Sequence, residues 1–161
     1  MSAPLRKITE EQPAPAASTA TISSRLADFA TGFSYQAIPA KVCERARYLI
    51  LDAVGIALAS THYDFAHRAL SGISAMSDGG DCSLIGMARR LPLRDAVLMN
   101  GVLVHGLDYD DTHIDAIVHP TASALPCALG VAEHAGASGR ELLSAYVLGV
   151  EVATRLGIAA K

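Results

Sequence analysis

The residues that could do chemistry are concentrated in one fifteen-residue stretch, from His105 to His119. Histidine exchanges protons near neutral pH, and aspartate can accept a proton, orient a histidine or bind a cation. The flanking sequence is almost wholly apolar, so solvation alone does not explain such a cluster. The stretch is therefore the candidate functional site. Its polar members are His105, Asp108, Asp110, Asp111, Thr112, His113, Asp115 and His119.

Cation binding is one alternative to acid–base chemistry in this stretch. A calcium-binding EF-hand loop starting at Asp108 fails, because its sixth and twelfth positions hold His113 and His119 in place of glycine and glutamate. A zinc site would combine these histidines or His105 with an aspartate, but no paired spacing of the HExxH kind is present.

Two further alternatives concern the aspartates. The sequence from Asp108 to Asp111 matches the D-x-D-D pattern of terpene cyclases, and Asp111 with Asp115 could hold magnesium on a helix. Four-letter acidic patterns arise often by chance. For any single aspartate, an N-cap or an Asx turn in a polar loop remains the alternative to a functional role.

Helices must position this stretch, because helical spacing of apolar residues dominates from Thr21 onward. Pro92 opens a helix that runs toward His105, and Pro120 opens another that ends at Gly136, so the candidate site lies between two helices. The other helices are predicted from Ile22 to near Gly32, from Pro39 past Ala57, from Asp64 to about Met76, and from the capping box of Ser138 and Glu141 into Lys161.

The predicted fold class is all-α, a helical bundle-like domain with at most one short β element. That element is Cys82 to Ile85, which follows a turn at Ser77 to Gly80. Residues 1–20 contain several prolines and no apolar signal-peptide core, so we expect a flexible N-terminal tail. Residues 21–161 are expected to form the helical domain.

Composition limits the partners. The 161 residues have a net charge of -3 without a basic block, so nucleic acid is not expected. Apolar stretches such as Leu49 to Ala59 fall short of the roughly 20 residues that span a membrane. Three scattered cysteines support no disulfide framework and favour a cytoplasmic location. With 51% hydrophobic and only 18% charged residues, the chain is expected to have a partner subunit or a companion segment.

Several motifs in this sequence resemble the MmgE/PrpD family, which includes 2-methylcitrate dehydratase, cis-aconitate decarboxylase and iminodisuccinate epimerase. The sequence HGLDYDDT from His105 to Thr112, followed by His119-Pro120, looks like the family signature. Leu51 to Gly55 is similar to an early helix of the family, and Asn100-Gly101 leads into the signature as it does in members. The resemblance spans residues 24–157.

The resemblance implies a large helical domain, a smaller α/β lid domain, a homodimer, and chemistry on a small di- or tricarboxylate without cofactor or metal. Members are much longer, so we expect this chain to be the N-terminal part of the helical domain, incomplete at its C-terminus and lacking the lid. Matching positions imply catalytic roles for Asp108, Thr112 and His119. We expect His105 and His113 to contact the substrate.

The residues themselves agree with that chemistry in part. Removing a proton next to a carboxylate, or expelling CO2, builds negative charge that donors or cations must stabilise. His119 could act as general acid or base, Asp108 as base or histidine partner, and Thr112 as a hydrogen-bond donor to a carboxylate. No Lys or Arg occurs between Arg94 and Arg140, so the cluster would repel an anionic substrate unless its histidines are protonated or cations come from another segment.

The expected function is a lyase, a 2-methylcitrate dehydratase-like enzyme that eliminates water from a hydroxy-polycarboxylate. The interval from Thr112 to His119 is one residue longer than in the mammalian decarboxylase branch, which disfavours that activity. The alternatives are a decarboxylase or epimerase of the same family, a terpene-cyclase-like acid site, and a catalytically inert fragment or helical interaction module.

Overall fold

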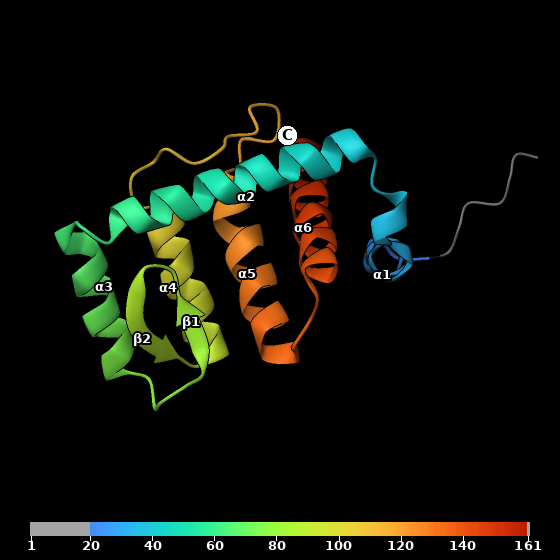
Figure 1. Cartoon of the computed structure of the whole chain (residues 1–161). Helices are drawn as coiled ribbons and strands as arrows, with labels where there is room; N and C mark the ends of the chain where they lie inside the picture. The colour runs from blue at the N-terminus through green and yellow to red at the C-terminus, as the bar shows by residue number, and fades with distance from the viewer. Residues whose placement is uncertain (1–19, 161) are drawn as a thin grey trace, which may run out of the picture.

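A computed structural model describes residues 20–160 of the chain. Within that range six α-helices, one short 3-10 helix and one β-hairpin follow one another (Figure 1). The tail predicted for residues 1–20 lies outside the described residues, Ala20 excepted. The elements are α1 (Ile22–Gly32), η1 (Tyr35–Ala37), α2 (Ala40–Ser60), α3 (Asp64–Ala75), β1 (Cys82–Leu84), β2 (Met87–Leu91), α4 (Leu93–His105), α5 (Pro120–Ala135) and α6 (Gly139–Ala159).

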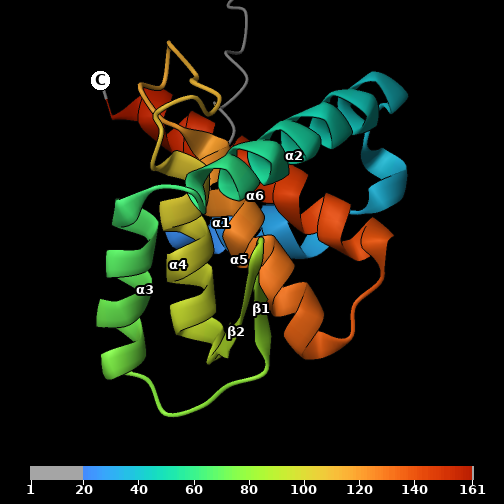
Figure 2. The same ribbon diagram turned by 60° about the vertical axis from the view of Figure 1, so that its left-hand side comes forward.

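Three helices, α4, α5 and α6, stand side by side, and the long helix α2 lies across one end of them (Figure 1). The loop 106–119, which joins α4 to α5, lies at that same end. Figure 2 shows the hairpin beside α4 and α5, with which β1 is in contact. The candidate site is therefore held where the ends of several helices meet.

The core forms where apolar faces of these helices meet. Met99 and Leu103 of α4, Leu125 of α5 and Tyr146 of α6 are fully buried in it. Such side chains contribute roughly 1.5–3 kcal/mol each to folding through burial. The last turn of α4 is also fixed by a buried hydroxyl, because Ser60 Oγ donates to the Leu103 carbonyl at 2.6 Å. The helix end that precedes the site is thus rigidly placed.

The all-α fold class is confirmed, and the β element is a two-stranded antiparallel hairpin. The predicted segment Cys82–Ile85 becomes β1, whereas β2 was not predicted. Its sequence, MARRL, exposes its three central residues and so lacks an alternating apolar pattern. Gly86 adopts a positive φ of 72° in the tight turn between the strands, a conformation that glycine accepts without steric cost.

The hairpin is attached to the helices by polar side chains. Buried Asn100 of α4 accepts the Ile85 N–H at 2.9 Å and donates to the Ser83 carbonyl at 3.0 Å. Glu133 of α5 accepts from the Ser83 backbone at 2.7 Å, from the Ser83 hydroxyl at 2.6 Å and from Arg90 at 3.0 Å. These hydrogen bonds satisfy backbone groups of Ser83 and Ile85 and hold the hairpin against α4 and α5. An isolated two-stranded hairpin would be only marginally stable in water.

Stability is expected to depend on the charge of Glu133. The hydroxyl and backbone hydrogen bonds from Ser83 lower the pKa of Glu133 below its ordinary value. Because the folded-state pKa is lowered, the contribution is complete above about pH 4.3 and is lost as the pH falls through the folded-state value. Glu133→Gln should lower the free energy of unfolding by about 1 kcal/mol at pH 7 and flatten its decline in acid. Urea unfolding at several pH values measures both; an unchanged pH profile would argue against this tether.

Helix α6 differs from the expectation that no apolar stretch reaches membrane-spanning length. Gly139–Ala159 is long and apolar enough to cross a membrane by length and composition, a test that core helices of soluble proteins also pass. Only 17% of its most apolar window is buried. The surface left open includes Leu156 and Ile158. The absence of a membrane partner remains a prediction.

Candidate active site

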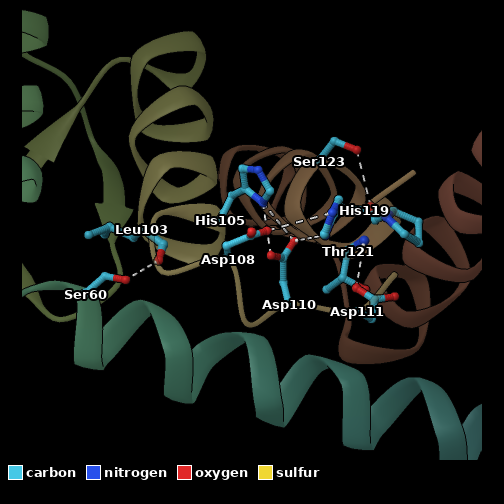
Figure 3. Close-up of polar contacts among 10 residues, drawn as sticks. Ser60, Leu103, His105, Asp108, Asp110, Asp111, His119, Thr121 and Ser123 are labelled. Atoms are coloured by element: carbon cyan, nitrogen blue, oxygen red, sulfur yellow. Dashed lines mark hydrogen bonds and ion pairs between the residues drawn. The ribbon is translucent and has the colours of Figure 1, made fainter. Parts of the chain in front are cut away.

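The site forms where α4 ends and α5 begins, with the loop 106–119 between them. His105 is the last residue of α4, and His119 is the residue that precedes the first turn of α5. Figure 3 shows their side chains meeting those of Asp108 and Asp110 from the loop. One ligating atom from each of the four residues lies within 4.8 Å of those from the other three. We call these residues, His105, Asp108, Asp110 and His119, the histidine–aspartate cluster.

Asp110 is the buried centre of this cluster, with a side chain that is only 1% exposed. Its two carboxylate oxygens lie 3.0 and 3.2 Å from His105 Nδ1. One of them lies 3.4 Å from His119 Nδ1, but that contact does not have hydrogen-bond geometry, and His119 Nδ1 is buried without a partner. The imidazole rings meet edge to face, with centroids 4.9 Å apart. Two proton-exchanging groups therefore share one carboxylate.

Asp108 lies at the solvent-exposed side of the cluster. Its carboxylate lies 3.9 Å from His119 Nε2. Its backbone has a φ of 56°, in the left-handed region that aspartate tolerates better than most residues. Ile117, at the other end of the loop, has a φ of 54°, which is strained for a β-branched side chain. Such strain persists only where surrounding contacts fix the backbone, and it is common at functional sites.

Several contacts fix this loop. His113 and Val118 form a short antiparallel bridge, and His113 Nδ1 accepts the Ala116 N–H at 3.1 Å. Gly157 of α6 packs against the loop so closely that an added Cβ would lie 2.6 Å from the Ala116 carbonyl oxygen. The loop is thus held both internally and by the last helix of the described chain.

Asp111 connects the loop to the first turn of α5. Its carboxylate accepts the Thr121 N–H at 3.2 Å, so it occupies one of the backbone donors at the N-terminus of α5 that could otherwise bind an anion. The Thr121 hydroxyl and the Tyr146 hydroxyl are 2.7 Å apart, both buried. Burial, against the opposing effect of the Thr121 hydrogen bond, raises the pKa of Tyr146 to about 12. Tyr146 is therefore a neutral structural group at physiological pH.

Tyr146→Phe should lower the free energy of unfolding by about 1–3 kcal/mol, because it leaves the buried Thr121 hydroxyl without a partner. Thermal or urea unfolding measures the loss. The double variant Tyr146→Phe, Thr121→Val removes both polar groups and should recover part of it. A single variant as stable as the wild type would show that this pair does not hold the start of α5.

The structure brings together three of the five residues proposed from sequence, Asp108, His105 and His119. Thr112 is exposed and His113 is turned into its own loop, so their roles as catalytic and substrate-contacting residues remain predictions. Asp110 was not assigned a role from sequence, since nothing in the pattern distinguishes it from Asp108 and Asp111. Among the described residues, the ion pairs of Asp108 and Asp110 are with histidines alone.

A groove of about 610 Å³ runs beside the cluster between α4 and α5. His105 and His119 border it, and its other walls are mostly apolar, with Leu98 and Val102 from α4 and Ala122 from α5. The imidazoles are thus the polar groups at one end of a mostly apolar groove. A ligand in this groove would lie within reach of both rings.

The cluster also has a donor set that could hold a divalent metal ion, since imidazole nitrogens and carboxylate oxygens are both zinc ligands. His113, which the sequence alternative included, is not part of that set. The same four side chains could instead act in acid–base catalysis without a metal. Sequence resemblance favoured chemistry without a metal, and that preference remains a prediction.

Fold and cluster together define a mostly helical domain with paired histidines at the junction of two helices. The chain belongs to the MmgE/PrpD family, and residues 24–161 match the model of the MmgE/PrpD N-terminal domain. The expected family membership is therefore confirmed, and the match includes every residue of the cluster.

Similar proteins include fungal and mammalian members of the family. The chain is 30% identical over 145 residues to a cis-aconitate decarboxylase-like protein, oryM, of Aspergillus oryzae, covering 86% of this chain and 30% of the relative. It is 25% identical over 141 residues to a cis-aconitate decarboxylase of Aspergillus terreus, covering 84% of this chain and 29% of the relative. It is 33% identical over 121 residues to the human cis-aconitate decarboxylase, covering 72% of this chain and 25% of the relative. The chain thus spans less than a third of the length of these relatives.

Proposed function

We propose that this chain supplies the acid–base histidines of a lyase that acts on a small di- or tricarboxylate. The observation that supports this most directly is the pair of imidazoles around buried Asp110, at the helix junction of an MmgE/PrpD domain. Imidazoles exchange protons near neutral pH, and a positioned general acid or base contributes about 10²- to 10⁴-fold to rate.

Decarboxylation of a cis-aconitate-like acid is the first candidate reaction. The C–C bond to one carboxylate breaks, CO2 leaves, and the electron pair remains on the carbon chain. That carbon then takes a proton, which His119 at the border of the groove is placed to supply. The similarity to cis-aconitate decarboxylases favours this reaction over the dehydration expected from sequence.

Dehydration of a 2-methylcitrate-like acid is the second candidate, and the presence of two imidazoles favours it. One imidazole would remove the proton next to a carboxylate, while the other would protonate the departing hydroxyl. His105 and His119 are 4.9 Å apart between ring centroids, close enough to act on adjacent carbons of one substrate.

Both reactions develop negative charge that the described site does not neutralise. No lysine or arginine among residues 20–160 pairs with the cluster, and Asp111 occupies a donor at the start of α5. The active enzyme therefore requires cations from outside these residues, from a companion segment or a second subunit. The open apolar surface of α6 is one face that such a segment could cover.

The test is a substrate assay of the protein that contains this chain, together with any segment that completes it. Cis-aconitate and 2-methylcitrate are offered separately, CO2 release is measured for the first, and new C=C absorbance is measured for the second. Turnover of either acid supports the proposal and selects the reaction. Absence of turnover with both acids would favour the alternative, a helical module without catalytic activity.

A further inference from the structure

The carboxylate of Asp110 has no charged partner apart from the two histidines among the described residues. Its side chain is 1% exposed, and removing an ionised carboxylate from water is costly unless strong hydrogen bonds replace the water. His105 supplies that replacement, because Nδ1 faces both carboxylate oxygens at 3.0 and 3.2 Å. Burial and geometry thus point to one dominant interaction, between Asp110 and His105.

This interaction determines where the proton lies on His105. An ionised carboxylate can only accept hydrogen bonds, so Nδ1 must donate and must therefore hold the proton. In the neutral ring Nε2 is then left with a lone pair, on the side of the imidazole away from Nδ1. The His105 side chain is 51% exposed and borders the groove, so it is open to a ligand.

His119 is held differently. Its Nδ1 lies 3.4 Å from the same carboxylate without hydrogen-bond geometry, and its Nε2 lies 3.9 Å from exposed Asp108. Neither contact fixes a tautomer as the bond to His105 does. The two imidazoles are therefore inequivalent, although both touch one carboxylate.

We propose that Asp110 is a positioning residue that holds His105 in its Nδ1-protonated tautomer, and that His105 Nε2 is a second proton-transfer group beside His119. The tautomer follows from the contacts alone, whereas the catalytic role of His105 rests on the proposed function. In a dehydration, His105 Nε2 takes the proton next to a carboxylate, and the C–H electron pair forms the new C=C bond. The hydroxyl leaves with a proton from His119, and Asp110 stabilises the imidazolium formed at His105.

Nitrogen-15 NMR of the imidazoles tests the positioning role without substrate. Long-range proton–nitrogen spectra distinguish the two neutral tautomers, and His105→Gln identifies the His105 signals by their loss. The wild type should show His105 protonated at Nδ1. Asp110→Ala should abolish that preference, while Asp111→Ala, which removes the adjacent carboxylate from the same loop, should retain it. Asp110→Asn, which keeps the side-chain shape, should weaken it and serves if the alanine variant does not fold.

Two outcomes would overturn the positioning role: a wild-type His105 protonated at Nε2, or an Nδ1-protonated His105 that is unaffected by both Asp110 substitutions. The catalytic role is tested separately in the active enzyme, where His105→Gln and Asp110→Asn should each lower kcat by more than they change KM. Unchanged kcat in both variants would overturn that role. Because the tautomer is measured without turnover, failure of the proposed function would leave the NMR result intact.

Discussion

Replacing His119 by glutamine is expected to lower kcat of the active enzyme by about 10²- to 10⁴-fold, the range for loss of a general acid or base. Glutamine keeps a polar side chain of similar length but cannot exchange a proton near neutral pH. His119 lies at the border of the groove, between the carboxylates of Asp108 and Asp110. Steady-state kinetics with whichever acid is turned over, cis-aconitate or 2-methylcitrate, measures the effect.

The matched control for this variant is His134→Gln. His134 is also on α5 but is exposed and in the last turn, away from the cluster. Its substitution should leave kcat and KM unchanged, since His134 belongs neither to the cluster nor to the lining of the groove. Equal kinetics for His119→Gln and His134→Gln would remove His119 from the catalytic machinery.

Leu103→Ala is expected to lower the free energy of unfolding by about 2–5 kcal/mol, the largest stability effect that we predict. Leu103 is completely buried in the last full turn of α4, below the site. Alanine would leave a cavity among residues of the core cluster, while the hydrogen bond from the Ser60 hydroxyl to the Leu103 carbonyl remains possible. Urea or thermal unfolding of the purified protein measures the loss.

Leu98→Ala gives the same chemical change on the exposed side of the same helix. Leu98 is 55% exposed, so its truncation should cost no more than about 0.5 kcal/mol. We therefore expect Leu103→Ala to lower the free energy of unfolding by much more than Leu98→Ala does, because only Leu103 is part of the core. If both lowered stability equally, the assignment of the buried face of α4 would be wrong.

Much of the helical architecture could be predicted, because its signals are local. The capping box of Ser138 and Glu141 starts α6 as predicted, and both of its hydrogen bonds are present. Pro39 and Pro92 predict the starts of α2 and α4 to within one residue. Each was expected in the first turn of its helix, whereas the structure places each at the N-cap, one residue before the first turn. Strand β2 was not predicted, since it depends on cross-strand pairing with β1 and on Glu133 from a distant helix.

The candidate site could be located from sequence but not resolved. A polar stretch between apolar helices identified the loop, but the sequence does not distinguish the roles of its aspartates. Tertiary contacts separate them: Asp108 is exposed, Asp110 is buried between two imidazoles, and Asp111 caps α5. His113 likewise has the residue type of a site residue, but the local fold uses its Nδ1 to hold the Ala116 backbone.

Transfer of solvent-derived protons at the cluster is the central claim, and deuterium incorporation tests it most directly. The active enzyme is supplied with cis-aconitate or 2-methylcitrate in D2O, and proton NMR follows deuterium at the carbons next to the carboxylates. The account predicts enzyme-dependent incorporation with the wild type and with His134→Gln. With cis-aconitate, it predicts near-complete loss of incorporation in His119→Gln, the group that supplies the proton to carbon. With 2-methylcitrate, it predicts that loss in His105→Gln, the group that removes the carbon-bound proton. Incorporation from cis-aconitate at the wild-type rate in His119→Gln, or none with the wild type and either acid, would contradict it.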